Sequence, residues 1–336
     1  MTENTANASR EIFDVALSTR VRLARNIEGI PFPIRLNSLE KQEIGRRICA
    51  ILQEKNICPD IIEMSSLYPF QVVALAERHL ISPEFVTGDD GRILLLGKDE
   101  KISIMLCERD HLRIQGFEKG LEPEKAYKTA SMYEDIISSR LQLAFDGKLG
   151  FLNQNPKDIG TGMRASVLMH LPALSRTGAM EKFSATAKKL GFSVRGSYGD
   201  GASVKGDIFR ISNTLTMGIS EEEALGNLKA IALQLATKER AAAEKFISDI
   251  NIKDRINRSA GLIRNAVLLS SDEMMELLSW VRLGALYGLV EADIDLIGKL
   301  FVSMQPANIC VLAKQKLPEN HLDEIRAATV RKIFEQ

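Results

Sequence analysis

The segment 18–26, STRVRLARN, holds three arginines within six residues. A guanidinium group donates hydrogen bonds in a planar fork that matches phosphate oxygens, so Arg20 and Arg22 could form part of a phosphate clamp. Arginines on a solvated surface element are the commoner reason for such a cluster. Taken alone, the segment leaves both interpretations open.

A second charged segment, ERDHLR at 108–113, joins two stretches rich in β-forming residues, 101–107 and 111–117. Carboxylates beside arginines at a strand corner could hold Mg²⁺ together with the phosphates of a nucleotide. The alternative is a charged hairpin tip. Within this segment His111 could act chemically or could be a hydrogen-bonded structural residue.

Two glycine-containing loops complete the set of candidates. Glycines in the loop 155–166, NPKDIGTGMRAS, would let the backbone approach an anion closely while Arg164 pairs with it. The glycine spacing of this loop differs from that of a Walker A P-loop. The loop 195–201, RGSYGDG, could be a mobile lid or simply a long hairpin connection.

The elements that must position these residues fall into two parts. The first part mixes helical periodicity with two strands around a glycine-rich loop at 191–213. From about residue 252 the pattern is helical only, which predicts an α+β body followed by a helical tail. The predicted helices span 38–55, 69–80, 122–145, 180–190, 220–249, 254–268, 271–287, 291–304 and 319–335.

Composition narrows the function classes. The 336 residues include 44 basic and 44 acidic side chains, which excludes a globally basic nucleic-acid binder but allows a local basic patch. No apolar run approaches the ~20 residues that span a bilayer, and the N-terminus lacks the apolar core of a signal peptide. We therefore expect a cytoplasmic protein without membrane association. Its four cysteines show no CxxC spacing, so we expect neither a zinc site nor disulfides.

The residue sequences of these segments and their order along the chain together resemble the phosphagen (guanidino) kinase family, and most closely its bacterial branch, the protein arginine kinases. The resemblance covers nearly everything from about residue 12 to the end. It is carried by STRVRLARN with PFP, SIMLCERDHLRIQ, GTGMRASVLMHLPAL, VRGSYGDG with ISNTLTMG, and the tail segments DRINRSAGLIRNA and WVRLGALYGLV.

The resemblance implies an antiparallel β-sheet flanked by helices, with a catalytic domain at 11–250 and a C-terminal helical domain at 251–336 that forms a homodimer. It also implies an ATP-dependent protein arginine kinase, which uses Mg²⁺ and moves the γ-phosphoryl group of ATP to the guanidinium of an exposed arginine on a protein substrate. The implied further partners are a small activator protein and a stress-response repressor or protease system.

By the same resemblance, five arginines wrap the nucleotide phosphates, and all are present here: Arg20, Arg22, Arg113, Arg164 and Arg195. Such a ring suits phosphoryl transfer, which depends more on positioning and charge neutralisation than on covalent chemistry. Asp110 matches the acidic residue near the metal and its water shell. The chain supplies no metal-binding cluster of its own in this reading.

The acceptor side departs from the family pattern. The corner motif Asn-Glu-Glu-Asp-His reads CERDH here, so Arg109 replaces the glutamate that normally holds the acceptor guanidinium and helps deprotonate it. Asp200 stands where the second acceptor contact is usually glutamate, and Asn155 stands where the family has a reactive cysteine. We therefore take Glu108, Arg109, Asp110 and Asp200 as the candidate catalytic residues.

These departures support an alternative function. Loss of a general base typically lowers a rate by ~10²–10⁴-fold, so the chain could be a nucleotide-binding pseudokinase that regulates a partner or a paralogous kinase. A non-catalytic adaptor acting through the helical tail is a third possibility. The family's C-terminal Arg-Asp-x-x-Arg-Ala stretch, which binds phosphoarginine, reads LDEIRA at 322–327, with Leu322 in place of the first arginine.

Overall fold

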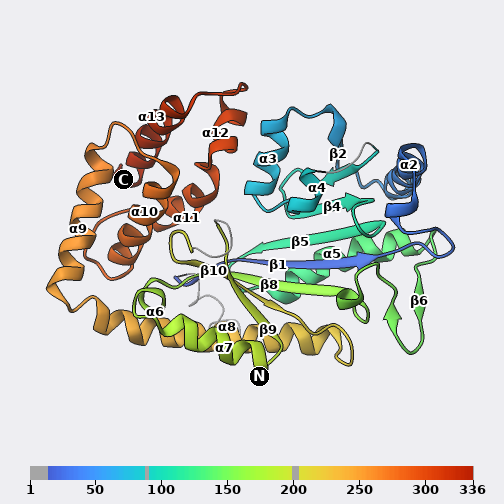
Figure 1. Cartoon of the computed structure of the whole chain (residues 1–336), viewed down its shortest axis with the longest axis horizontal. Coiled ribbons are helices and arrows are strands. Elements are labelled where there is room, and N and C mark those ends of the chain that lie inside the picture. Colours follow the sequence, from blue (N-terminus) through green and yellow to red (C-terminus); the bar gives the residue numbers. More distant parts are fainter. Residues whose placement is uncertain (1–13, 88–90, 199–203, 336) are drawn as a thin grey trace.

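The computed structural model describes residues 14–87, 91–198 and 204–335, and an eight-stranded antiparallel sheet lies at its centre (Figure 1). The strand order is β2-β3-β4-β5-β1-β8-β10-β9, which places β1 in the middle. The strands are β1 (Ala16–Arg25), β2 (Asp60–Glu63), β3 (Ile93–Leu96), β4 (Ile102–Leu106), β5 (Leu112–Lys119), β8 (Met163–His170), β9 (Phe192–Gly196) and β10 (Ile208–Asn213). A separate hairpin pairs β6 (Phe145–Asp146) with β7 (Gly150–Phe151).

One face of the sheet packs on helices. Alternate residues of the central strands, such as Val21, Leu23 and Val167, are fully buried in the largest apolar cluster. The β5 residue Gly116 allows close packing, because a Cβ there would lie 2.1 Å from the Ala126 carbonyl oxygen. The helices that contribute buried residues to this cluster are α2 (Ser38–Glu54), α5 (Pro123–Ser138), α6 (Pro172–Arg176), α7 (Ala179–Lys189) and α8 (Glu221–Phe246).

The C-terminal helices form a second core. They are α9 (Ile250–Asn265), α10 (Ser271–Leu286), α11 (Ile294–Ser303), α12 (Pro306–Leu312) and α13 (Glu319–Val330). Figure 1 shows this group facing the short helices α3 (Pro69–Glu77) and α4 (Pro83–Val86). Glu77 of α3 joins the two regions, since its carboxylate accepts hydrogen bonds from the backbone N–H groups of Ala307 at 3.1 Å and Asn308 at 3.0 Å.

The predicted fold class, an antiparallel sheet flanked by helices with a helical C-terminal region, is confirmed. The domain boundary at 250/251 stays a prediction, and it falls at the first residue of α9. Across the described ranges, no helix is long and apolar enough to cross a membrane.

Several helices differ from the sequence prediction: α4, α6 and α12 were not predicted, α5 ends earlier, and α9 begins at Ile250 rather than near 254. Helix α5 ends at Ser138 rather than near 145, because the following residues pair with the end of β1 through the bridge between Ile27 and Leu143. Helix α12 was not predicted, since it has only seven residues and its first N–H groups are bound by Glu77, 230 positions earlier in the chain.

Candidate active site

The sheet register places the predicted arginines on one face. Arg20 and Arg22 alternate with the buried residues of β1, and Arg22 lies opposite Arg164 of β8. On β10, Arg210 lies opposite Arg195 of β9. Directly opposed residues of antiparallel strands project to the same side, so these side chains share the face that is turned away from the main core.

Arg113 of β5 extends the same face. Its position is two residues from Gln115, which lies opposite Arg22, and residues two apart on a strand point to the same side. The five predicted phosphate-binding arginines are therefore brought together, and Arg210 is a sixth that the sequence analysis missed.

Five of these six arginines lack an acidic partner: Arg20, Arg22, Arg164, Arg195 and Arg210 have no carboxylate within ion-pair distance in 14–87, 91–198 and 204–335. Arg164 has only a 3.5 Å hydrogen bond to Ser193, and Arg210 donates to the Ser197 hydroxyl at 3.2 Å. A group of half-buried cations without paired carboxylates is unfavourable in the empty protein and favours an anion as ligand.

The pKa values of these arginines show that the neighbouring positive charges repel one another. Burial lowers the pKa of Arg20 well below its usual value, and Arg210 and Arg22 lower it further. For Arg22, burial and then the charge of Arg113 lower the pKa to about 10, although Asp158 acts in the opposite direction. Bound phosphate oxygens would relieve both the desolvation and the repulsion, because they supply opposite charge and hydrogen-bond acceptors.

The corner between β4 and β5 neutralises Arg113, which is the buried arginine of this group. The Arg113 guanidinium forms an ion pair with Glu108, and its Nε lies 3.6 Å from Asp110 Oδ2. Glu108 also accepts a hydrogen bond from the Ser82 hydroxyl. Its carboxylate is thus fully engaged in holding the corner.

Asp110 supplies a carboxylate beside the arginine face that would suit a hydrated Mg²⁺. Its Oδ1 accepts hydrogen bonds from Asn26 Nδ2 at 2.9 Å and from the Gln154 N–H at 3.0 Å. Its Oδ2 is buried and lacks a hydrogen-bond partner in the described part of the chain. No group of three acidic, histidine or cysteine residues that could cage a metal occurs there. This donor set suits Mg²⁺, which usually keeps several waters and binds through one or two carboxylates plus substrate phosphates.

Two neighbours of Asp110 have different roles. His111 accepts a hydrogen bond at Nδ1 from the Ile27 N–H at 3.0 Å, which leaves Nε2 to donate to the Pro31 carbonyl at 2.8 Å. Burial lowers its pKa, so His111 is a neutral structural residue. Arg109 is half-exposed and forms an ion pair with Glu84 at 3.2 Å.

A cavity of about 440 Å³ opens above this face. Its floor includes Arg20, Arg22 and Arg210, and its walls come from 76–84, from the end of β9 and from Gln305 at the start of α12. Tyr198 and His79, whose rings lie 5.1 Å apart, stand together in the wall. Asp200, the remaining predicted catalytic residue, lies outside the described residues.

Comparison with known proteins identifies the family of this chain. Residues 42–242 match the model of the ATP:guanido phosphotransferase C-terminal catalytic domain, and residues 249–336 match that of the protein-arginine kinase McsB C-terminal domain. The chain belongs to the ATP:guanido phosphotransferase family. The sequence resemblance is thereby confirmed, and the protein is a phosphotransferase enzyme by family.

Similar proteins cover nearly the whole chain. A relative from Halothermothrix orenii, named protein-arginine kinase, is 38% identical over 322 residues, which cover 95% of this chain and 92% of the relative. A protein of the same name from Clostridium tetani is 35% identical over 98% of both chains. Among solved structures, lombricine kinase has a TM-score of 0.61 and 24% identity, covering 68% of this chain and 67% of that chain. The substrate-free duplicated taurocyamine kinase of Schistosoma mansoni has a TM-score of 0.60 and 24% identity, covering 69% and 34%. These two structures share the fold.

The position of the family's reactive cysteine holds a structural residue in this family member. The Asn155 side chain accepts a hydrogen bond from the Lys157 N–H at 3.2 Å and donates to Asp158 at 3.1 Å, which closes a short turn. The nearby Cys107 is buried beneath the sheet, and burial raises the pKa of its thiol to about 12. Neither residue supplies a nucleophile.

The tail segment 322–327 is a packing element. Leu322 is buried in the second core. Arg326 is 1% exposed, and its guanidinium donates to the carbonyls of Met304 at 2.9 Å and Leu269 at 2.7 Å and pairs with Asp323 at 2.5 Å. Internal contacts therefore occupy the one arginine that this segment retains.

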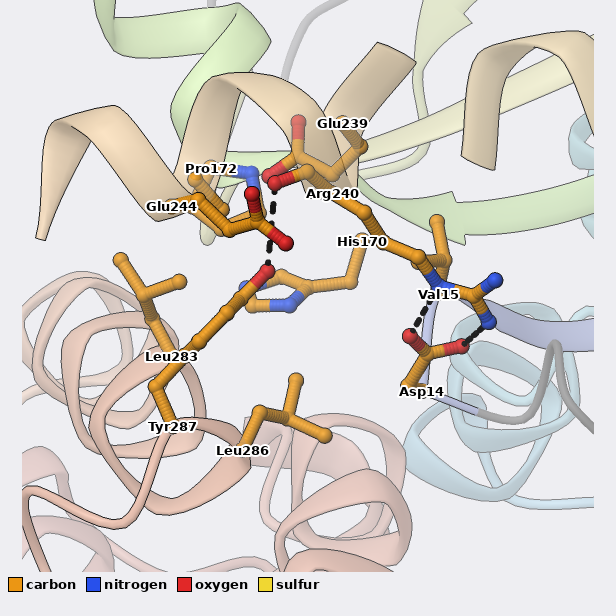
Figure 2. Close-up of a pocket in the computed structure, with 11 residues that line it drawn as sticks. Asp14, Val15, His170, Pro172, Glu239, Arg240, Glu244, Leu283, Leu286 and Tyr287 are labelled. Carbon is orange, nitrogen blue, oxygen red and sulfur yellow. Dashed lines mark hydrogen bonds and ion pairs between the residues drawn. The ribbon is translucent and has the colours of Figure 1, made fainter. Parts of the chain in front are cut away.

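A second cavity, of about 220 Å³, lies between α8 and α10 (Figure 2). Asp14 and Arg240 pair there at 2.7 Å, and Glu239 accepts hydrogen bonds from the Ala173 N–H at 2.8 Å and the Leu174 N–H at 2.9 Å. Burial raises the pKa of Glu239 to about 7. In contrast to the arginine face, Asp14, Arg240 and Glu239 here bind one another or the backbone.

Proposed function

We propose that this protein is an ATP-dependent protein arginine kinase. The observation that carries the proposal is the face with four half-buried arginines that lack acidic partners, Arg20, Arg22, Arg164 and Arg210, next to the carboxylate of Asp110. Phosphoryl-transfer sites need such preorganised positive charge. The names of the relatives support protein arginine as the acceptor.

The reaction assigns a role to each part of the site. Arg20, Arg22 and Arg164 bind the phosphate oxygens and hold the γ-phosphoryl group in line with the acceptor nitrogen. Arg195, at the exposed end of β9, closes the ring of charge. Asp110 is the residue that would hold a hydrated Mg²⁺, and the ion would supply further charge neutralisation on the phosphates. The acceptor nitrogen loses a proton to solvent in the open cavity and forms the new bond to phosphorus as the bond to the leaving oxygen of ADP breaks.

One observation favours the alternative of a nucleotide-binding pseudokinase. The Glu108 carboxylate is already bound by Arg113 and Ser82, so it is not free to take a proton from the acceptor. If no other base serves the acceptor, the site would bind ATP without turnover.

Formation of phosphoarginine distinguishes these functions. The purified protein is incubated with γ-labelled Mg-ATP and an arginine-rich protein, and acid-labile label on arginine is measured. We expect labelling by the native chain, loss of it in Arg22→Ala, and full activity in Arg46→Ala, which changes an arginine that is 69% exposed. ATP binding without labelling would establish the pseudokinase, and absence of ATP binding would overturn both functions.

We further propose that the C-terminal helices form a homodimer. The apolar side chains of α10, including Leu277, Leu278 and Trp280, are buried within the same chain and leave little surface for a partner. Support comes instead from Ile250, Val267, Leu268, Leu262 and Leu312, which stay 48–74% exposed. A monomeric mass in solution at micromolar concentration would reject the dimer.

A further inference from the structure

We propose that Glu84 is the carboxylate that binds the guanidinium of the acceptor arginine, and that Arg109 occupies this carboxylate until the substrate replaces it. The inference rests on the proposed arginine kinase function and assigns the acceptor subsite. It gives Arg109 the role of an internal substitute for the substrate side chain.

The position of Glu84 is the first argument. Glu84 lies in the first turn of α4 and lines the same cavity as Arg20 and Arg22. A guanidinium bound to its carboxylate would therefore share the cavity with the side chains that hold the phosphates. Proximity of this kind is the main requirement for transfer between two bound groups.

The backbone around Glu84 is fixed to the buried corner. Ser82 donates its hydroxyl hydrogen to Glu108, and the same oxygen accepts a hydrogen bond from the Phe85 N–H at 3.2 Å. The Glu84 carbonyl accepts a hydrogen bond from Arg92 at 2.7 Å. The main chain is thus held in place, while the Glu84 side chain remains 50% exposed and accessible to a ligand.

The other described carboxylates near the cavity are already engaged. Glu108 is buried against Arg113 and Ser82. Glu77 accepts three hydrogen bonds at the start of α12. Asp110 accepts two hydrogen bonds at Oδ1 and lies beside Arg113. Glu84 differs, since the only side chain paired with it across the described ranges is an exposed arginine.

The pair between Glu84 and Arg109 can exchange at little cost. Its two side chains are 50% and 46% exposed, and ion pairs of this kind contribute little because water solvates both charges. A substrate arginine brings the same planar donors as Arg109, so it can form the same charge-assisted contact with the carboxylate. Arg109, which replaces the family's acceptor-binding glutamate, is then a competitor that the substrate displaces.

Binding of an arginine peptide tests this exchange without requiring turnover. A short peptide with one arginine is titrated into the Mg-ADP-loaded protein by calorimetry, with the lysine version as the ligand control. Glu84→Gln should weaken binding by about tenfold, since it removes a charge-assisted contact. Arg109→Ala should strengthen binding by about two- to fivefold, because it removes a weak internal competitor.

Glu54→Gln is the matched control. Glu54 forms a similarly exposed pair with Arg140 at 3.3 Å, away from the cavity, so peptide affinity should stay at the native value. Thermal unfolding midpoints of all variants should agree with that of the native chain, which separates loss of binding from loss of folding. Unchanged affinity in Glu84→Gln would overturn the inference, and unchanged or weaker binding in Arg109→Ala would overturn the role given to Arg109.

The outcomes also separate this inference from the proposed function. Peptide binding that depends on Glu84, in a protein that forms no phosphoarginine, would support the acceptor subsite and overturn the kinase function. Phosphoarginine formation by a protein whose peptide affinity ignores Glu84 would support the kinase function and overturn the subsite.

Discussion

Two sets of arginines in this protein, one half-buried and one fully buried, differ in what surrounds them. On the open face of the sheet, Arg20 and Arg22 lie among other arginines, and their pKa values are lowered by burial and by like charge. Elsewhere, Arg25 pairs with Glu134 at 2.5 Å and lies 3.6 Å from the centre of the Phe151 ring. Arg326 is likewise bound by two carbonyls and Asp323.

The difference separates function from stability. An arginine that is saturated by internal partners contributes to the fold and has no donors left for a ligand. An arginine cluster without counter-charges makes the empty protein less stable, and it persists because a ligand supplies the missing charge. Within one residue type, the partners of the side chain therefore identify which arginines belong to the site.

The largest expected effect comes from removing two arginines of the open face. Arg22→Ala combined with Arg164→Ala should lower the affinity for Mg-ATP by between about 10² and 10⁴, because each charge-assisted hydrogen bond contributes roughly 1.5–3 kcal/mol. Calorimetry measures this loss, and Arg46→Ala is the control at an exposed position. Native affinity should also fall with added salt. If the double variant binds ATP like the native chain, the nucleotide does not lie on this face.

Substitutions in the second set of arginines, which have internal partners, should lower the stability of the fold instead of the affinity for ATP. Arg25→Ala leaves Glu134, whose side chain is 12% exposed, without its partner, and loss of one member of a buried pair costs roughly 3–5 kcal/mol. Chemical denaturation measures the free energy of unfolding. Arg140→Ala, which removes the partner of the exposed Glu54, should change it by less than about 1 kcal/mol. Equal effects of the two substitutions would show that Arg25 is not a structural residue.

The buried carboxyl of Glu239 should make the stability of the fold depend on pH. Its folded pKa of about 7 exceeds the ordinary value of 4.5, so the protonated carboxyl favours folding. This contribution is complete below about pH 4.5 and disappears as the pH rises through about 7. The free energy of unfolding changes over this window by at most about 3 kcal/mol. We expect the free energy of unfolding of the native chain to fall over this window relative to Glu239→Gln, as measured by denaturation at several pH values. Parallel pH profiles would contradict the assignment.

Thiol labelling is expected to have the smallest effect. Cys107 is buried and its pKa is about 12, whereas Cys58 is exposed. An alkylating reagent at pH 8 should therefore modify Cys58 first and leave ATP affinity unchanged, as followed by peptide mass mapping and calorimetry. Rapid loss of ATP binding that maps to Cys107 would show that this cysteine has replaced the family's reactive one.

The fold was predictable where local pattern determines structure. The hairpin of β4 and β5 and the long helices α8 and α10 follow from strand composition, capping residues and apolar periodicity. Strand β1 was not assigned, although arginines alternate with Val21 and Leu23 in its sequence, and this two-residue period was the signal available. Contacts such as that between Asp14 and Arg240 join residues 226 positions apart, which no local pattern encodes.

The candidate site was predictable only where its residues belong to local sequence motifs. The family motifs located the five arginines that we propose bind phosphate, and the sheet register brings them to one face. Arg210 was missed because its position opposite Arg195 depends on how β9 and β10 pair across the loop. The exposed pair of Arg109 with Glu84 was also not predictable, since only the packing of α4 beside the corner brings these two residues together.

Thermal unfolding with and without Mg-ATP tests the central claim most directly. The native chain should gain stability as ATP is added, by about 2.7 kcal/mol at a hundred times its dissociation constant. Arg22→Ala should unfold at the same temperature as the native chain or higher without nucleotide, because repulsion is relieved, and should gain little at the same ATP concentration. A variant that is less stable than the native chain when empty, yet gains as much from ATP, would contradict the claim that these arginines form the nucleotide site.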